Sequence, residues 1–431
     1  MKEKVWIFMA GVLVLLFFPF LAWLGDTSVL VPQRYETLPY WEEIVEVRAE
    51  AEAVEDLSKS QLPTSYDARE EGHTPEVKDQ KRNGECWAYA ALSTLEASLL
   101  PEYAERFSVE AMVEDKKKNF GDSEEGGNSQ ISSASLLSWR SPLRLGETEA
   151  RWHVQEIQMG DKKDLTAIKE AVYLYGAVMA SFYSQMTSFD ESVGNYRRET
   201  AAYFCDSEEK VNHVVVILGW DDNFPKENFA KQPKEDGAFL CLNSWGENFG
   251  DGGYFYVSYE DKMIGNSYVF YSKIEKAVEG QTLYETDVRG WDERVGYGTN
   301  TLWLRNTYFA QADESLYAVG LYCLEPNQKY QIYAGTSYME LVAEGSFDFK
   351  GYTTIPFQKE IEINEGEEFQ VRVKLQAELG REVETALSLM SETRNPNARG
   401  YISWDGKDWE CLEESMQRSL CLKAYAISRE E

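Results

Sequence analysis

The sequence predicts an α+β protein in which a domain with a helical half and a β half is followed by an all-β antiparallel sandwich. Apolar residues recur at helical spacing after position 86, whereas apolar runs typical of strands dominate after position 213. Beyond about residue 280 the strands become short and alternate between apolar and polar side chains, which is typical of a sandwich. We therefore expect one domain at residues 62–275 and a second at 280–431.

The amino terminus has the features of a targeting segment. Lys2 and Lys4 precede an uncharged, largely apolar run from Val5 to Leu24. A run of this length can cross a bilayer, and lysines before it favour export of the chain after it. We expect residues 1–25 to be either a signal peptide or a signal anchor, two alternatives that the sequence leaves open. The body would then lie on the extracellular side of the cell membrane, anchored to it or secreted.

Residues 26–61 are rich in Glu and Ala and predict a charged linker or short pro-segment, partly helical. In the first domain, apolar spacings of three and four predict a helix over 86–100, which Pro101 helps to end. A second helix is expected over 164–175. Strands are expected at 176–181, 214–218, 239–242 and 254–257, and the uninterrupted apolar run 214–218 suits a strand that is buried on both faces.

The second domain shows period-two alternation. Residues 316–321 and 330–333 predict strands. Around the turn residues 364–366, alternating apolar residues at 361–363 and 369–375 predict a β-hairpin with one buried face.

Composition limits the possible partners. Hydrophobic residues make up 43% of the 431 residues, so a large core is expected. The 74 Asp and Glu against 43 Lys and Arg give a formal net charge of −31, which argues against nucleic acid as a partner. Six cysteines are too few for disulfide bonds to be the main source of stability in an exported chain of this size. Their pairing cannot be read from the sequence. We expect no metal site and no cofactor.

A thiol and an imidazole are the first two candidate catalytic groups. Cys86 stands where a helix begins, and the helix amino terminus favours a thiolate. His213 opens the buried strand and is one of only three histidines; His73 and His153 are not followed by a run that predicts a rigid core strand. Cys86 would be the nucleophile and His213 its proton shuttle.

Two amides and an indole complete the candidate site. Gln80 lies six residues before Cys86, where its side chain could stabilise an oxyanion together with the Cys86 backbone amide. Asn243 would accept the second imidazole N–H and set the tautomer. Trp245 could shield this hydrogen bond from water.

The blocks Gln80…Gly84-Glu85-Cys86-Trp87, Asn212-His213-Val214-Val215 and Asn243-Ser244-Trp245-Gly246 resemble the signature blocks of papain-like cysteine peptidases. Their order and spacing match that family. The resemblance implies a helical lobe and a β-barrel-like lobe, with Cys86, His213, Asn243 and Gln80 as the catalytic residues. It also implies that Gly126 and Gly127 bind an extended substrate, and we add Trp245 to this substrate-binding set.

The sequence departs from the family pattern at three places. Asn83 replaces the cysteine that usually precedes the nucleophile, and the usual partner before Gly126 is absent too, which suggests a bacterial-type branch. Glu85 replaces a small residue beside the nucleophile, and its charge could raise the thiol pKa or favour basic substrates. A long inhibitory propeptide is not evident in the 37 residues between Leu24 and Leu62.

The second domain resembles the lectin-like domain that follows the peptidase in some bacterial surface proteins. The similarity rests on residues 285–288, 296–298 and 301–304. It implies a sandwich, and a cell-surface glycan is a possible partner, although a domain that only positions the peptidase is equally compatible with the sequence.

We expect an exported cysteine endopeptidase that acts on peptides or proteins and contacts the membrane through its amino-terminal segment. One alternative is a surface adhesin with an inert peptidase-like domain. Another is acyl transfer by the same triad, as in transglutaminase-like folds.

Overall fold

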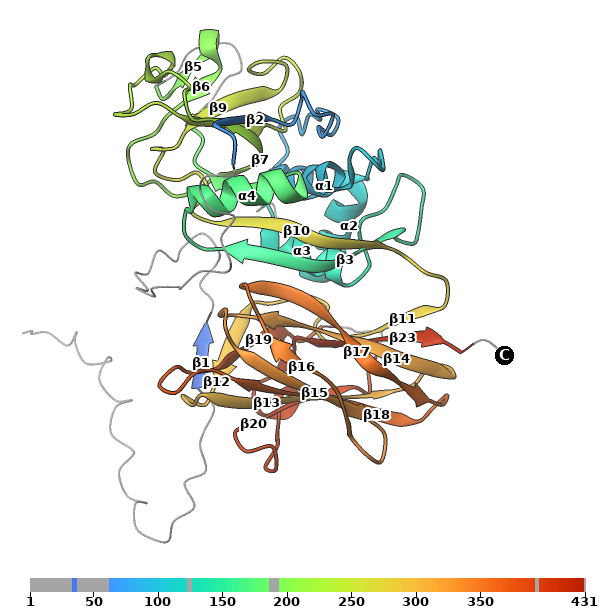
Figure 1. Ribbon diagram of the computed structural model, residues 1–431. Helices are drawn as coiled ribbons and strands as arrows, with labels where there is room; N and C mark the ends of the chain where they lie inside the picture. Colours follow the sequence, from blue (N-terminus) through green and yellow to red (C-terminus); the bar gives the residue numbers. More distant parts are fainter. Residues whose placement is uncertain (1–32, 37–61, 122–125, 186–193, 392–394, 430–431) are drawn as a thin grey trace, which may run out of the picture. The chain divides into compact units, whose positions relative to one another are not determined.

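The computed structural model describes residues 33–36, 62–121, 126–185, 194–391 and 395–429 (Figure 1). The apolar run 5–24 and most of the charged segment 26–61 lie outside these ranges. Across the described ranges no helix is both long and apolar enough to span a membrane. Strand β1 (Gln33–Glu36) shows that this piece of the segment, which we expected to be partly helical, is extended.

The helices of residues 62–276, called here the amino-terminal region, carry side-chain caps that explain where three of them begin. The elements are α1 (Cys86–Leu99), α2 (Val109–Phe120), α3 (Ser129–Leu137) and α4 (Leu165–Tyr175), with short 3₁₀ turns η1 (Arg198–Thr200) and η2 (Lys226–Asn228). The side chains of Ser108, Asn128 and Asp164 accept backbone N–H bonds at the starts of α2, α3 and α4. The predicted helices 86–100 and 164–175 are confirmed, while α2 and α3 were not predicted.

The strands of the amino-terminal region belong to one large sheet. They are β2 (Ser65–Asp67), β3 (Trp152–Gly160), β4 (Val178–Phe182), β5 (Tyr196–Arg197), β6 (Ala202–Tyr203), β7 (His213–Asp221), β8 (Ala238–Leu242), β9 (Tyr254–Ser258) and β10 (Tyr268–Lys276). Figure 1 shows α1 beside β10 and α3 beside β3, while α2 packs on α1 and α3. The four predicted strands correspond to β4, β7, β8 and β9.

Strand β7 is the centre of this region because both of its faces are buried. Val214 and Val216 belong to the hydrophobic core that contains the buried face of α1. Val215 and Ile217 belong to a second core that contains the buried face of α4. The predicted two-sided burial is confirmed, and it fixes the direction of the strand that begins at His213.

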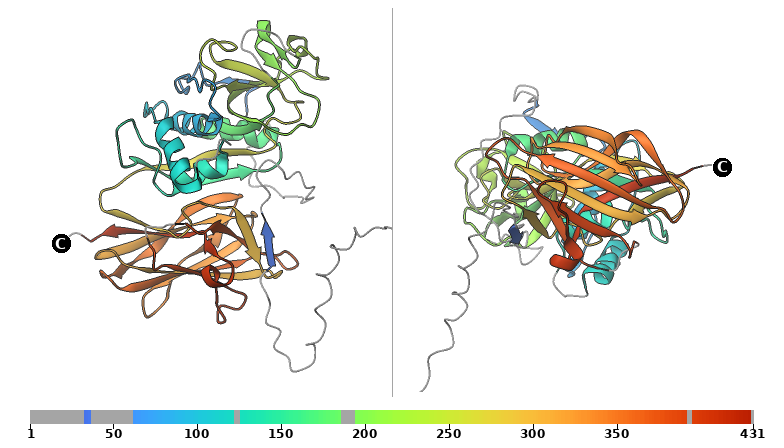
Figure 2. Two further views of the ribbon diagram at one scale, coloured as in Figure 1. Left: turned by 180° about the vertical axis from the view of Figure 1, so that it is seen from behind. Right: turned by 90° about the horizontal axis from the view of Figure 1, so that it is seen from below.

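Residues 281–429, called here the carboxy-terminal region, contain one short helix, α5 (Leu412–Ser415), among antiparallel strands. The strands are β11 (Gln281–Tyr284), β12 (Glu293–Gly296), β13 (Thr301–Phe309), β14 (Glu314–Cys323), β15 (Lys329–Gly335), β16 (Glu340–Ser346), β17 (Gly351–Ile363), β18 (Glu368–Gln376), β19 (Glu384–Leu389), β20 (Arg399–Ser403), β21 (Glu410–Cys411), β22 (Arg418–Leu420) and β23 (Leu422–Ser428). Six of them form a sheet in the order β16-β15-β18-β13-β20-β21, and a four-stranded sheet has the order β1-β12-β19-β22. The left view of Figure 2 shows the strands of this region in stacked layers.

The predicted hairpin of residues 361–375 is wrong. β17 and β18 are consecutive strands, but β17 pairs with β14 and β3, whereas β18 pairs with β13 and β15 in the six-stranded sheet. The turn at 364–366 therefore passes from one sheet to the other. Both strands do bury alternate side chains as expected. Alternation reports which face of a strand is buried, and it does not report which strand lies beside it.

The two regions share a sheet, since β17 pairs with β3 from Gly351–Gln158 to Thr353–Glu156. Gly351 makes the start of this pairing possible, because a Cβ there would lie 1.9 Å from the carbonyl oxygen of Ile157. Strand β1 joins the carboxy-terminal region as well, by pairing with β12.

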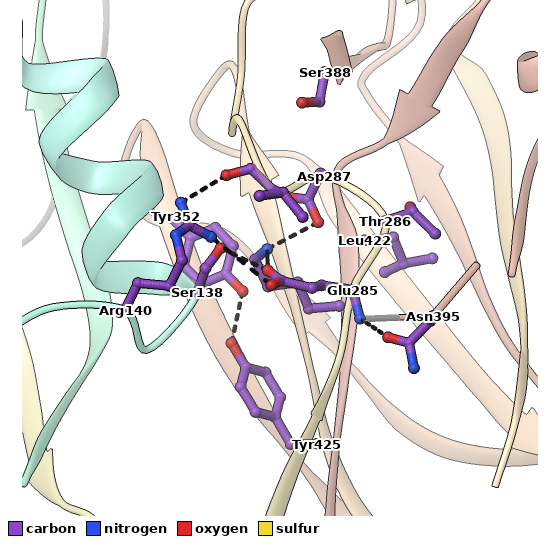
Figure 3. A network of polar contacts seen from close by, with 12 residues as sticks. Ser138, Arg140, Glu285, Thr286, Asp287, Tyr352, Ser388, Asn395, Leu422 and Tyr425 are labelled. Atoms are coloured by element: carbon purple, nitrogen blue, oxygen red, sulfur yellow. Dashed lines mark hydrogen bonds and ion pairs between the residues drawn. The ribbon is translucent and has the colours of Figure 1, made fainter. Parts of the chain in front are cut away.

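A buried polar network also joins the regions (Figure 3). Lys423 Nζ lies 2.7 Å from Glu285 Oε2 and 2.8 Å from Asp287 Oδ1, and all three side chains are almost fully buried. Ser138 at the end of α3 donates to Glu285 Oε2 at 2.6 Å, and Arg140 donates to the carbonyl of Val288 at 2.8 Å. The Glu285 carboxylate and the Val288 carbonyl of one region thus accept hydrogen bonds from the other.

Lys423 keeps its charge in this network. Burial opposes the ammonium form, but the charges and hydrogen bonds of Asp287 and Glu285 outweigh it and raise the pKa of Lys423 above its ordinary value. Removal of this cation alone would leave Asp287 without a counter-charge among the described residues and Glu285 with only the Arg140 guanidinium, 3.9 Å away. Loss of a buried counter-charge is far costlier than loss of a surface ion pair.

We predict that Lys423→Met destabilises the protein by about 3–5 kcal/mol. Lys359→Met is the matched control, because Lys359 pairs with Glu340 at the surface and its side chain is 69% exposed. Chemical denaturation of the two variants and the wild type measures the difference. A Lys423→Met protein as stable as the control would contradict the importance of the network.

Candidate active site

Cys86 is the first residue of α1, and its helix is held rigidly in the core. Trp87, Ala88, Ala91 and Leu92 are all buried, whereas Cys86 itself keeps partial exposure. The thiol therefore stands at the amino terminus of a fixed helix, where unpaired amides and the helix dipole favour an anion.

His213 and Asn243 lie at the ends of neighbouring strands. His213 begins β7, and Asn243 follows β8, which pairs with β7. The imidazole Nε2 lies 2.8 Å from Asn243 Oδ1, in a buried hydrogen bond. Because Nε2 faces an amide oxygen, it is the proton-bearing nitrogen, and Nδ1 is left for Cys86. The predicted contact is present.

Cys86 and His213 are hydrogen bonded, and each changes the other's protonation. Burial opposes the thiolate, but the charge and hydrogen bond of His213, together with the backbone N–H groups of Val214 and Trp87, outweigh burial and lower the pKa of Cys86. Burial likewise opposes the imidazolium, yet Cys86 and the hydrogen bond to Asn243 raise the pKa of His213. The arrangement favours a thiolate–imidazolium pair.

Gln80 lies beside Ser244, the residue after Asn243, because the chain segments 79–80 and 244–245 run side by side. The backbone N–H of Gln80 donates to the carbonyl of Ser244 at 2.8 Å, and Asp79 and Trp245 form a β-bridge. The Ser244 hydroxyl donates to Gln80 Oε1 at 2.5 Å. Gln80 Nε2 donates to the carbonyl of Asn83 at 2.5 Å, which leaves its second N–H for another acceptor.

The indole of Trp245 stacks on the imidazole of His213, with ring centroids 4.9 Å apart and an interplanar angle of 28°. The rings of Trp245 and Phe249 form a T-shaped pair with centroids 5.0 Å apart. The indole therefore covers one face of the imidazole, as the predicted shielding role requires.

Gly126 and Gly127 lie against the start of α1. A Cβ at Gly126 would fall 2.7 Å from the carbonyl oxygen of Gly84, and one at Gly127 would fall 2.4 Å from the ring of Trp87. Only glycine lets this segment approach so closely. Gly126 is exposed, so its backbone is accessible beside the thiol's helix.

The expectation about His153 needs correction. His153 lies inside β3, which pairs with β10, so it does belong to a rigid core strand. Its ring stacks on Trp139 with centroids 3.8 Å apart, and burial lowers its pKa to about 4. His73 is hydrogen bonded to Tyr66. Of the three histidines, only His213 is hydrogen bonded to Cys86.

All six cysteines lie in described parts of the chain, and each is a free thiol. Four of them, Cys205, Cys241, Cys323 and Cys421, are buried, while Cys86 and Cys411 are partly exposed. Across the ranges that the structure covers, no group of three or more His, Cys, Asp or Glu side chains is arranged to hold a metal ion.

Two contributors to the site were not predicted. Ser244 fixes the orientation of the Gln80 amide, and its position within the Asn243-Ser244-Trp245-Gly246 motif was the available signal. The Val214 backbone N–H stabilises the thiolate, and backbone donors leave no trace in a sequence.

We predict that the thiol of Cys86 reacts with iodoacetamide at pH values well below the ordinary pKa of a thiol. The substitution His213→Ala should remove this reactivity at low pH. Without the imidazolium, the thiolate loses the charge and hydrogen bond of His213 and keeps only the backbone N–H groups of Val214 and Trp87 against burial. Its pKa should therefore rise, and alkylation near pH 6 should slow by at least about tenfold. His73→Ala is the matched histidine control, and Cys86→Ala gives the background from Cys411. Equal alkylation rates in the His213 and His73 variants would contradict the coupling.

Comparison with known proteins agrees with this geometry. The sequence pattern of the papain family cysteine protease matches residues 62–136 and 143–274, and the pattern of the lectin like domain matches residues 283–426. Cathepsin K of Mus musculus is 25% identical over 217 residues, which make up 46% of this chain and 60% of that protein. Cathepsin S of Bos taurus is 28% identical over 214 residues, or 45% of this chain and 59% of that protein. The chain therefore spans about three fifths of the length of these curated relatives.

A solved structure extends the similarity to both regions. The crystal structure of the cysteine protease and lectin-like domains of Cwp84, a surface layer associated protein of Clostridium difficile, covers 86% of this chain and 89% of its own. The TM-score is 0.74 at 21% sequence identity, so the two proteins share a fold. The chain thus carries a papain family cysteine protease domain followed by a lectin-like domain.

Proposed function

We propose that this protein is an exported cysteine endopeptidase that hydrolyses peptide bonds through a covalent acyl-enzyme. The observation that carries the proposal is the contact of Cys86 with His213, which is in turn bonded to Asn243 at 2.8 Å. A thiol with a lowered pKa, a buried imidazole and an orienting amide are the three groups that thiol-dependent acyl transfer needs.

In the proposed reaction, the Cys86 thiolate attacks the carbonyl carbon of the scissile peptide bond. The oxyanion accepts hydrogen bonds from the Cys86 backbone N–H and the remaining N–H of Gln80. His213 gives its proton to the departing amine, and a thioester remains on Cys86. Water then attacks the thioester with His213 as general base, which releases the acid and restores the thiolate.

The substrate is proposed to lie as an extended strand along Gly126 and Gly127. The exposure of Gly126 supports this, because a peptide backbone needs uncovered N–H and C=O groups to pair with. Trp245 is proposed to flank the bound peptide on the other side, where it stacks on His213.

An extracellular site of action is part of the proposal. Lysines ahead of the apolar run 5–24 support export of the chain. They also support contact with the membrane in a protein from which this run has not been cleaved. Similarity in fold to the named surface layer associated protein agrees with this location. A net charge of −31 suits a self-repelling surface protein and disfavours nucleic acid.

The two alternatives predict different products. An inert adhesin would cleave no peptide, and the assembly of Cys86, His213, Asn243 and Gln80 in one place argues against it. Acyl transfer would join the acyl group to an amine in place of water. Mass spectrometry of the products formed from a peptide library separates hydrolysis from cross-linking.

We predict that Cys86→Ala abolishes peptide hydrolysis while circular dichroism and the unfolding transition stay unchanged. Cys411→Ala is the matched control, because Cys411 is the other partly exposed thiol and lies in the carboxy-terminal region. Residual turnover in Cys86→Ala equal to that of Cys411→Ala would overturn the proposed function.

A further inference from the structure

The outer face of the six-stranded sheet carries an unusual set of side chains. Along β13 the residues Leu302 and Leu304 are buried, so Trp303 and Arg305 lie on the opposite face. The neighbouring strands β18 and β20 alternate in the same way. We call the residues Trp303, Arg305, Arg372, Lys374, Tyr401 and Trp409 the cationic aromatic face.

Two arginines face each other across the ladder. Arg305 on β13 is the direct partner of Arg372 on β18, and Lys374 is the partner of Trp303. Like charges directly opposite in a sheet destabilise it. Among the described residues, no carboxylate lies within ion-pair distance of Arg305, Arg372 or Lys374, although acidic residues outnumber basic ones in the chain.

Aromatic rings lie next to the arginines of the cationic aromatic face. The guanidinium carbon of Arg305 lies 3.9 Å from the ring centroid of Tyr401 and 4.4 Å from that of Trp409. Arg372 lies 5.9 Å from the ring of Trp409. Beside them Trp303 stacks on Tyr333, with centroids 6.0 Å apart. The rings hold the arginines in place without neutralising them.

The two arginines are also partly desolvated. Both side chains are half-buried, and Arg305 Nε is buried with no hydrogen-bond partner in the described structure. Burial is the first cause that lowers the pKa of Arg305, and the charge of Arg372 adds to it. Arg372 donates to the amide oxygen of Gln370 at 2.7 Å, but this neutral acceptor leaves the positive charge uncompensated.

This arrangement differs from that of Lys423, a fully buried cation of the same chain. Lys423 has two carboxylate partners. In the part of the chain that the structure describes, the arginines of the cationic aromatic face have no carboxylate of this kind. Such a departure from the usual pairing of charges is common where a ligand supplies the missing partner.

We propose that the cationic aromatic face binds an anionic saccharide, whose carboxylate or phosphate lies on Arg305 and Arg372 and whose sugar ring packs on Trp303 or Trp409. Guanidinium forks match carboxylate and phosphate oxygens. Aromatic surfaces with a few placed polar groups are typical of sites for small molecules. This assignment names residues for the glycan partner that sequence similarity only suggested.

Charge density distinguishes this ligand from nucleic acid. The cationic aromatic face has three cations on adjacent strands, whereas nucleic acid binding requires an extended basic surface to neutralise many phosphates. The net charge of −31 repels a dense polyanion more strongly than a saccharide with one acidic group.

The test uses the full chain with Cys86→Ala, so that no proteolysis occurs during the measurement. Isothermal titration with trigalacturonic acid presents the carboxylate, and titration with mannose 6-phosphate presents the phosphate. Maltotriose is the neutral sugar control, and triglutamate is an anionic control without a sugar. We expect at least one anionic sugar to bind, and Arg305→Gln or Arg372→Gln to weaken it roughly tenfold or more.

Two further variants sharpen the result. Trp409→Ala should also weaken binding. Lys359→Gln should leave binding unchanged although it too removes one positive charge, because Lys359 lies on β17, outside the six-stranded sheet. Arg372→Gln should melt at the same or a higher temperature than the wild type, because it relieves the repulsion with Arg305. An arginine needed only for folding would lower the melting temperature.

Three outcomes would overturn the proposal. They are no binding of either anionic sugar, equal binding of triglutamate, and equal loss of affinity in the Lys359 variant. Because binding is the readout, its failure is distinguishable from a failure of the proposed peptidase activity.

Discussion

The chemistry of this protein depends on a balance between burial and charge at one contact. Burial alone would keep both Cys86 and His213 neutral. Each is charged because the other is opposite in sign and within hydrogen-bond reach, and Asn243 adds a bond that favours the imidazolium. The helix amino terminus stabilises the sulfur further. The pair is therefore stable only as a pair, and its geometry must be held by rigid elements.

The fold supplies that rigidity from two directions. Helix α1 and strand β7 share one hydrophobic core, so the thiol and the imidazole are fixed relative to each other. The carboxy-terminal region is held to the same scaffold by the β17–β3 pairing and by the buried bonds around Lys423. Its cationic aromatic face lies on a different sheet from this junction. Peptide hydrolysis and saccharide binding are thus assigned to separate surfaces of one chain.

Local patterns in the sequence predicted much of this structure. Helical spacing located α1 and α4, the unbroken apolar run located β7, and the scarcity of histidine identified His213 as the partner of Cys86. Some contacts between residues far apart in the sequence were not predicted. Alternation could not tell that β17 and β18 enter different sheets, and the flanks of His153 did not reveal that it lies in a core strand. The Val214 N–H that supports the thiolate is a backbone group, which no side-chain motif encodes.

The most direct test of the central contact is the protonation state of the His213 ring. The chain has three histidines, so nitrogen NMR of histidine-labelled protein resolves each ring. We expect His213 to be an imidazolium at neutral pH in the wild type. In Cys86→Ala it should become neutral, because burial then acts without the thiolate. A His213 ring with the same protonation state in both proteins would contradict the thiolate–imidazolium pair.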